Sequence, residues 1–179
     1  MMKKILFVTC LVFTISTNAQ SISQDYSVLR NANLSNDHTV DGERSILNAV
    51  RTAGFADQLE SEGPFTLLVP TESAITNLPD EYRFRSLLKP ENKEKLVSIV
   101  AHHLIKGKFK ANDLMKLVEE NNGKATIESI KGDELVLSLS YGKIKIEDKR
   151  GNTTTVINKD INSSNGVIHI IDNVLIPFK

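Results

Sequence analysis

The residues best suited to chemistry in this sequence are four histidines, His38, His102, His103 and His169. His102 and His103 are neighbours on a predicted helix, so their side chains point about 100° apart and cannot hold one metal ion from one face. A zinc-binding helix needs the pattern H-E-x-x-H, which the sequence lacks. His103 and His169 lie on predicted apolar elements, where a hydrogen-bonded core histidine is favoured over a catalytic base.

Other patterns that support catalysis or cofactor binding are absent from the sequence. Its one cysteine, Cys10, lies in an apolar leader, and G-x-S-x-G, the phosphate-binding loop and G-x-G-x-x-G do not occur. Residues 37–48 resemble a calcium loop, but Asn48 occupies the position that needs a bidentate glutamate. We therefore predict no catalytic residue, no metal and no cofactor. An enzyme acting through a polar cluster around His103 or His169 is the third hypothesis for function.

The composition is typical of a globular chain without a strong charge. The 179 residues, 40% hydrophobic and 25% charged, suit a single domain with a sizeable core. The 22 basic and 22 acidic side chains give a net charge of zero. This balance gives no electrostatic reason to expect a nucleic acid or an anionic membrane as partner.

The start of the chain has the pattern of a secretory signal peptide. Two lysines precede an apolar run over residues 5–15, and small residues follow up to Ala19. We predict a signal peptide over residues 1–19, cleaved after Ala19, and a secreted, periplasmic or cell-surface protein of bacterial origin. The run of about 11 apolar residues is too short to span a bilayer, so no stable membrane span is expected after cleavage. Lipidation of Cys10 is an alternative that the bulky residue before it disfavours.

The first half of the remaining chain is mainly helical in pattern. Residues 20–41 are polar and aperiodic, so they predict a leader before the domain. A continuous apolar run predicts a buried strand over 65–69, followed by a short helix that Thr71 can cap. Apolar residues at helical spacing predict three further helices: one near 46–53, one from Pro90 with an apolar stripe through Leu104, and one over 111–120.

The second half has the pattern of strands. Apolar and polar residues alternate over 135–141 and again over 144–147, which predicts a hairpin with one wet face. The apolar run 167–171 predicts a central strand. Helices with one early strand, followed by hairpins, predict the α+β class in a single domain rather than alternating βαβ units.

Three segments together resemble the fasciclin domain family. Residues 63–75 (GPFTLLVPTESAI) are similar to its first signature, residues 99–108 (IVAHHLIKGK) to its middle helix, and residues 165–177 (NGVIHIIDNVLIP) to its closing signature. The order and spacing agree, and the similarity covers roughly residues 42–178. We therefore assign residues 42–179 to a fasciclin-like domain.

The resemblance implies a fold, a general function and four candidate residues. The fold would be a β-wedge packed with several helices, and the function would be adhesion or matrix contact at a surface, without catalysis in most members. The family's tyrosine–histidine pair falls on His102 and His103, with the tyrosine lost. Its aspartate–isoleucine element falls on Asp160 and Ile161, and Asn162 follows where some animal members have a leucine that integrins recognise.

These observations lead to one preferred function and one alternative. The preferred function is a non-enzymatic, secreted or surface-associated module, monomeric, that binds an extracellular protein or polysaccharide. The alternative is a carrier of a small apolar ligand or glycan in a groove between the helices and the β-wedge. Aromatic residues make up only 6% of the chain and tryptophan is absent, which weakens a sugar-stacking site. For Asp160 and Ile161, a strand-end turn with one buried isoleucine is favoured over a recognition role.

Overall fold

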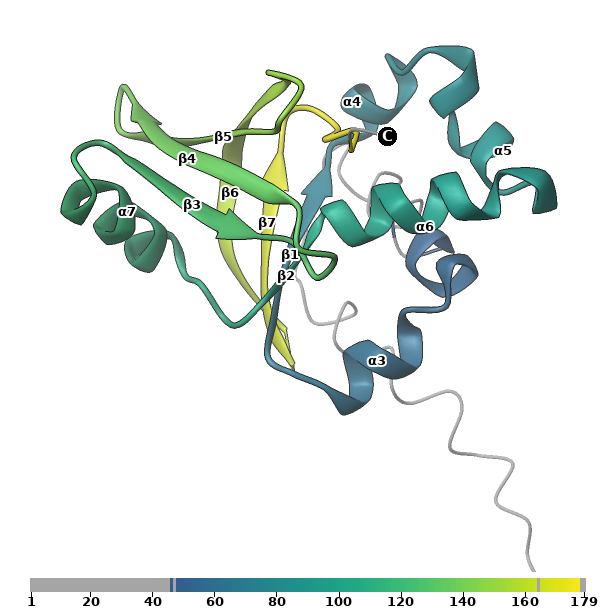
Figure 1. The fold of residues 1–179 in the computed structure, drawn as a ribbon, viewed down its shortest axis with the longest axis horizontal. Helices are drawn as coiled ribbons and strands as arrows, with labels where there is room; N and C mark the ends of the chain where they lie inside the picture. The colour runs from purple at the N-terminus through teal and green to yellow at the C-terminus, as the bar shows by residue number, and fades with distance from the viewer. Residues whose placement is uncertain (1–45, 47, 164, 178–179) are drawn as a thin grey trace, which may run out of the picture.

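The computed structural model describes residues 46, 48–163 and 165–177 (Figure 1). The predicted signal peptide over 1–19, the leader over 20–41, Cys10 and His38 lie outside these residues. Within the described part, no helix combines the length and the apolar character that a membrane crossing requires.

The described residues form one seven-stranded mixed sheet. Its order is β2-β1-β7-β6-β5-β4-β3, in which β1 and β7 run parallel and the other neighbours run antiparallel. The strands are β1 (Phe65–Pro70), β2 (Leu104–Lys106), β3 (Lys124–Glu128), β4 (Glu134–Ser140), β5 (Lys143–Glu147), β6 (Thr153–Ser163) and β7 (Gly166–Ile171).

The two outer strands of the sheet come close to each other, so the sheet is nearly closed. A bridge joins Ile105 of β2 to Ser129, directly after β3, and the Ile130 amide donates to the Leu104 carbonyl at 2.8 Å. We call this junction the seam, and it is made of these four residues. It lies beside the end of α6, which brings His102 into contact with the turn after β3.

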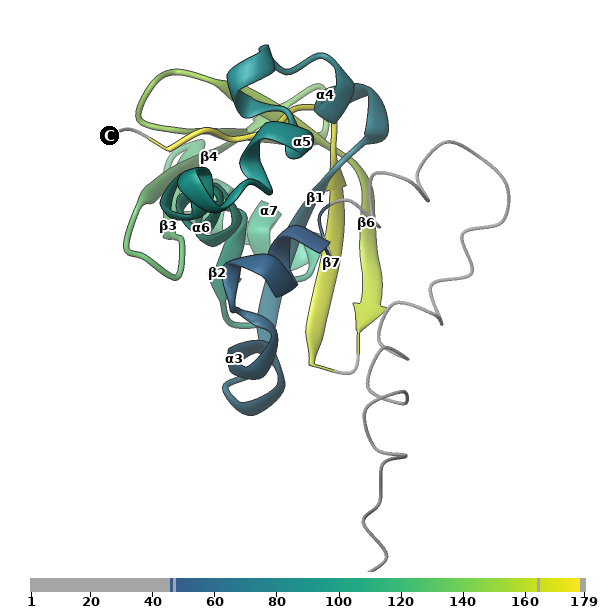
Figure 2. The same ribbon diagram turned by 90° about the vertical axis from the view of Figure 1, so that its right-hand side faces the viewer.

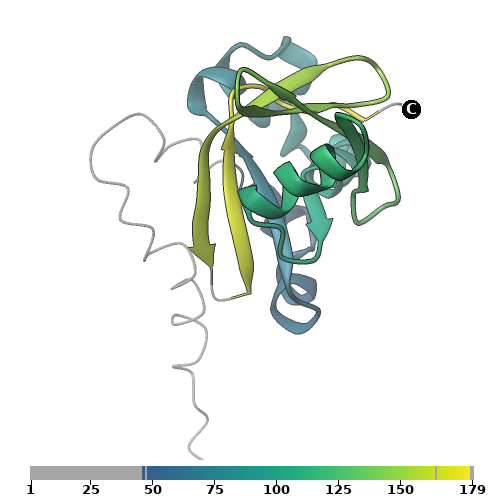
Figure 3. The ribbon, with the colours of Figure 1, turned by 90° about the vertical axis from the view of Figure 1, so that its left-hand side faces the viewer.

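Helices cover the sheet from two sides. Figure 2 shows α3 to α6 in front of β1 and β7, and Figure 3 views the side that α7 covers, against β3 and β4. The helices are α3 (Ala56–Ser61), α4 (Glu72–Thr76), η1 (Asp80–Tyr82), α5 (Phe84–Leu87), η2 (Pro90–Asn92), α6 (Lys93–His102) and α7 (Ala111–Glu120), and residues 46 and 48–53 are also helical.

Two apolar cores lie on the two sides of β1 and β7. The helical core contains Leu67, Val69, Ile168 and Ile170 together with buried residues of α6, whereas the sheet core contains Leu68 and Ile171 together with α7 and β3 to β5. Successive side chains of a strand point to opposite faces, so both faces of β1 and β7 are covered. This explains why residues 65–69 and 167–171 are continuous apolar runs.

Gly166 fits a position where two strands start very close together. A Cβ atom built on Gly166 would lie 1.8 Å from the Phe65 carbonyl oxygen, and its φ of 156° is one that other residues rarely adopt. Phe65 is the register partner of Gly166 in the parallel pair. Glycine is therefore required by strand packing at this first residue of β7.

The predicted α+β class is confirmed, and several local predictions agree with the structure. The Thr71 hydroxyl accepts from the Ala74 amide at 3.2 Å and caps α4, and α7 has the predicted bounds. The helix expected to carry its stripe through Leu104 instead ends at His102, because residues 104–106 pair with β1 as β2. Strand β3 was not predicted.

The expected strand-end turn at Asp160 and Ile161 is wrong. Both residues lie inside the long strand β6, between register shifts against β7. Asp160 has φ 60°, so the strand bulges there and its side chain is redirected toward α7. Ile161 packs against the helical core but is only half-buried.

Candidate functional site

The histidine pair lies where α6 ends against the sheet. Helix α6 follows the turn η2 that Pro90 opens, and its residues Leu96, Ile99 and Val100 face the helical core. His102 is the last helical residue and His103 follows it. Both are buried, at 2% and 0% exposure, and they make different contacts.

His103 has both ring nitrogens hydrogen-bonded to the backbone. Its Nδ1 donates to the Ile99 carbonyl at 2.8 Å, and its Nε2 accepts from the Leu175 amide at 3.2 Å. Burial lowers the pKa of His103 to about 4, and the neighbouring His102 acts in the same direction, whereas the Ile99 bond opposes it. His103 is therefore a neutral connector between α6 and the segment after β7, as the core-histidine interpretation predicted.

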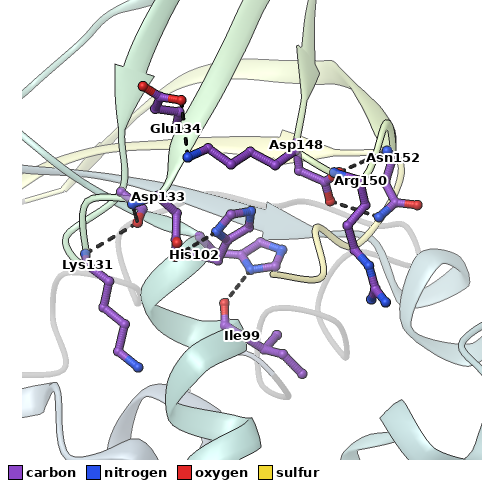
Figure 4. A network of polar contacts seen from close by, with 11 residues as sticks. Ile99, His102, Lys131, Asp133, Glu134, Asp148, Arg150 and Asn152 are labelled. Carbon is purple, nitrogen blue, oxygen red and sulfur yellow. Dashed lines mark hydrogen bonds and ion pairs between the residues drawn. The ribbon is translucent and has the colours of Figure 1, made fainter. Parts of the chain in front are cut away.

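His102 makes a contact with a carboxylate across the edge of the sheet (Figure 4). Its Nδ1 lies 3.2 Å from Oδ2 of Asp133, and since an ionised carboxylate only accepts, Nδ1 donates this bond. Asp133 is partly exposed, so the pair has one buried and one solvent-facing member. A buried histidine oriented by a carboxylate is an arrangement that enzymes use.

The turn between β3 and β4 fixes Asp133 in this position. The Ser129 hydroxyl accepts from the amides of Lys131 and Asp133 at 3.3 and 3.1 Å, and the Ser129 amide donates to the Asp133 carbonyl at 2.9 Å. Ser129 is also the seam residue bridged to Ile105. The His102–Asp133 contact therefore adds a side-chain link at the seam.

The other nitrogen of His102, Nε2, is buried without a hydrogen-bond partner among the described residues. A buried nitrogen of this kind costs free energy unless it has a partner. Because it is sealed from solvent, a substrate has no direct access to it in this arrangement. The described residues also contain no group of three histidine, cysteine, aspartate or glutamate side chains placed to hold a metal ion.

His169 joins β7, the bulge in β6 and the start of α7. Its Nε2 donates to the Phe109 carbonyl at 2.8 Å, and its Nδ1 accepts from the Asp160 amide at 3.2 Å. The Asp160 carboxylate accepts from the Ala111 amide at 2.8 Å, at the first residue of α7. Burial lowers the pKa of His169, against smaller opposing effects of Phe109 and Asp160. We call His169, Asp160, Phe109 and Ala111 the His169 clip.

The four predicted site residues do not form one site. No hydrogen bond or ion pair in the described part of the chain joins His102 or His103 to Asp160 or Ile161. Three of the four have structural contacts: His103 in its backbone bonds, Asp160 in the His169 clip and Ile161 against the helical core. His102 alone retains an unused polar atom.

A hollow of about 720 Å³ lies along the outer side of α6. Its walls include Tyr82, Val97, Lys131, Ile176 and Pro177, so it lies between the helices, the turn after β3 and the segment after β7. The apolar lining is joined at the rim by charged side chains of α6. The groove expected between the helices and the wedge stays a prediction, because none of the residues that line this hollow belongs to a strand.

Sequence reasoning missed Asp133 and strand β3. Asp133 lies 31 residues after its partner His102, so no local spacing reveals the pair. The signal for β3 was available, because Lys124–Glu128 alternates exposed and buried residues over five positions. That alternation sets the exposed face of the sheet.

Comparison with known proteins gives consistent results. The family model of the fasciclin domain matches residues 42–177. Two proteins of Synechocystis sp. are similar: protein sll1483, 38% identical over 74% of this chain and 66% of its own length, and the uncharacterized protein sll1735, 34% identical over 74% and 87%. Transforming growth factor-beta-induced protein ig-h3 of Oryctolagus cuniculus is 33% identical over 72% of this chain but 17% of its own length.

The structure resembles a solved pair of FAS1 domains from the insect cell adhesion molecule fasciclin I. The TM-score is 0.59 at 24% identity, over 77% of this chain and 46% of that chain. The likeness in fold agrees with the match of the family model. This chain belongs to the fasciclin domain family.

Proposed function

We propose that this protein is a non-enzymatic, secreted or surface-associated module that makes adhesive contacts with an extracellular protein or polysaccharide. The observation that supports this most is the fasciclin domain over residues 42–177, shared with a domain pair from a cell adhesion molecule. The chemistry of the buried groups agrees, because the oriented histidine, His102, has its second nitrogen sealed from substrate. The signal-peptide pattern at the start of the sequence supports export.

The adhesive surface in this proposal does not consist of the buried candidates. His103 and Asp160 act as connectors in the fold, so substitution there lowers stability before it changes a contact with a partner. Variants at these two positions, His103→Ala and Asp160→Ala, therefore serve as stability controls in a binding experiment.

The test is binding of the full chain to immobilised extracellular proteins, neutral polysaccharides and anionic polysaccharides, followed by biolayer interferometry. We expect saturable binding to at least one of them, retained in Asp160→Ala and His103→Ala at a temperature where both are folded. Absence of binding to all of them would contradict the proposal. A turnover activity abolished by His102→Gln in a folded variant would also contradict it.

The hollow beside α6 supports a second candidate function, the carriage of a small amphiphilic ligand. Tyr82, Val97 and Ile176 would contact its apolar part, and Lys131 is exposed at the rim. A chain purified from its native source would then contain a co-purifying small molecule, detected by mass spectrometry after denaturation. Val97→Trp would fill the hollow and should abolish retention of that molecule, whereas Lys89→Gln, outside the lining, should not.

A further inference from the structure

The outer face of β3, β4 and β5 is exposed along β3 and at the strand ends, and half-buried at Val136, Ser138 and Lys145 in its middle. On each of these strands, alternate residues such as Ile127, Leu137 and Ile146 point into the sheet core. The residues between them therefore point outward, because successive side chains of a strand alternate. The outward residues of β3 and most of those of β5 are exposed.

Three lysines lie close together on this outer face. Lys124 on β3 and Lys145 on β5 are both register partners of Ser138 on β4, and Lys143 is the partner of Ser140. Two strand spacings put the Cα atoms of Lys124 and Lys145 about 9 to 10 Å apart, and Lys143 lies about 7 Å along β5 from Lys145. We call Lys124, Lys143, Lys145, Ser138 and Ser140 the lysine face.

The acidic residues of these strands lie at the other end of the same surface. Glu128 and Glu134 are register partners, and Glu147 is the last residue of β5. Glu134 already pairs with Lys149 at 3.2 Å. No ion pair in the described part of the chain involves a lysine of the lysine face. Folding therefore does not account for three neighbouring cations, which repel one another.

Tyr141 is a second feature of this region without a role in folding. It lies at the tip of the hairpin between β4 and β5, fully exposed, with φ 50°. That conformation is unfavourable for an aromatic residue, and hairpins of this kind prefer asparagine followed by glycine. An exposed, strained tyrosine beside three unpaired lysines is typical of a contact surface rather than of a fold requirement.

We propose that the lysine face, with Tyr141 at its edge, binds an anionic polysaccharide, a carboxylated or sulfated sugar chain. The charge is complementary, because mobile ammonium groups can contact successive anionic groups along a polymer. The serine hydroxyls between the lysines supply hydrogen bonds that sugar hydroxyls can match. This inference rests on the proposed function and specifies the partner class.

The other anionic macromolecules fit this surface less well. Lysine clusters that recognise anionic membranes have about four to eight basic residues, and the lysine face has three without an apolar wedge beside them. Nucleic-acid surfaces occur in strongly basic domains, whereas this chain has a net charge of zero. A carboxylated or sulfated sugar chain presents hydroxyls beside its anionic groups, which matches the alternation of serines and lysines on the lysine face.

The experiment measures binding of the full chain to dextran sulfate and to polygalacturonate, with neutral dextran as a control. The test variant changes Lys124, Lys143 and Lys145 to glutamine. The matched control changes Lys89, Lys106 and Lys108, which are exposed and lie elsewhere, so that both variants lose the same charge. We expect the first triple to weaken binding roughly tenfold or more and the second less than about threefold. Salt should weaken binding of the unchanged chain.

A second variant separates binding from stability. Tyr141→Asn should raise the melting temperature, because asparagine tolerates φ 50°, and should weaken binding of both anionic polymers. The inference would be overturned if the lysine triple and Tyr141→Asn both bind the anionic polymers as the unchanged chain does. It would also be overturned if the two lysine triples lose the same affinity, or if the chain prefers phosphatidylserine vesicles to either polymer. If the chain binds a protein or a neutral polysaccharide but neither anionic polymer, the proposal for the lysine face is wrong, whereas the proposed adhesive function stands.

Discussion

The His169 clip and the His102–Asp133 pair both join a histidine to an aspartate, but only the clip gives both ring nitrogens a hydrogen-bond partner. In the clip, both nitrogens of His169 and the Asp160 carboxylate have partners, and the bonds join a bulge, a central strand and a helix start. At the seam, His102 uses one nitrogen and leaves the other buried without a partner among the described residues. A polar group that is fully satisfied holds the fold together, whereas one that is half-satisfied contributes little net stability.

The largest expected effect comes from placing a charge in the clip. His169→Asp would bury a carboxylate in a strand covered on both faces, at a cost of several kcal/mol, and we expect the chain to lose its cooperative thermal transition. Circular dichroism during heating measures this. The matched change His102→Asn at the seam should cost less, since it places no charge in the buried position beside Asp133. A clip variant that melts like the unchanged protein would disprove the placement of β7.

Acidification should destabilise the fold through its buried neutral histidines. The pKa of His103 is about 4 in the folded chain and 6.5 in the unfolded chain. Between pH 4 and pH 6.5 the unfolded chain therefore binds more protons than the folded chain. Stability is therefore complete above pH 6.5 and falls as the pH drops toward 4, by about 3 kcal/mol for this group. Urea denaturation across this range gives the slope, and His103→Gln should flatten it. A slope unchanged by that substitution would contradict the assignment.

Removing the carboxylate of the clip should have an intermediate effect. Asp160→Ala leaves the Ala111 amide without its acceptor and places an alanine at φ 60°, so we expect a loss of about 1 to 2 kcal/mol. Asp160→Asn keeps an acceptor oxygen and tolerates this backbone, so its loss should be about 0.5 kcal/mol or less. The free energy of unfolding in urea distinguishes the two. Equal losses would contradict both the bond and the backbone argument, because asparagine keeps the acceptor and tolerates φ 60° whereas alanine does neither.

The smallest expected effect is at the seam. His102→Phe removes the bond to Asp133 but also removes the unpartnered nitrogen, so we expect a change below about 1 kcal/mol. His103→Phe, one residue later, should cost more, because it deprives the Leu175 amide of its acceptor. Paired urea titrations of the two variants test the comparison directly. A lower free energy of unfolding for His102→Phe than for His103→Phe would contradict the comparison.

The sequence predicted the elements that local patterns determine. The apolar run 167–171 indicated a central strand because both of its faces are covered, and the amphipathic spacing of 111–120 gave α7 correctly. Strand β2 escaped prediction, since Leu104 and Ile105 continue the apolar spacing of the preceding helix although they pair with β1. The signal peptide over 1–19 stays a prediction.

The contacts that could not be predicted are those between residues far apart in the chain. His102 meets Asp133 through the seam, and Asp160 reaches Ala111 through a bulge that no residue spacing indicates. The resemblance to the family therefore identified candidate residues such as His103 and Asp160. Their role as connectors in the fold became clear only from their hydrogen-bond partners. The lysine face was hidden for the same reason, because Lys124 and Lys145 become neighbours only through the register with Ser138.

The parallel pairing of β1 with β7 affects when this chain can fold during its synthesis. Phe65 pairs with Gly166, about 100 residues later, and Leu175 beyond β7 supplies the amide that His103 accepts. A ribosome therefore makes nearly the whole domain before β1 has its central neighbour, and such distant pairings form slowly. The sheet cannot be completed until β7 has been made, which is compatible with the export that the first residues of the sequence predict.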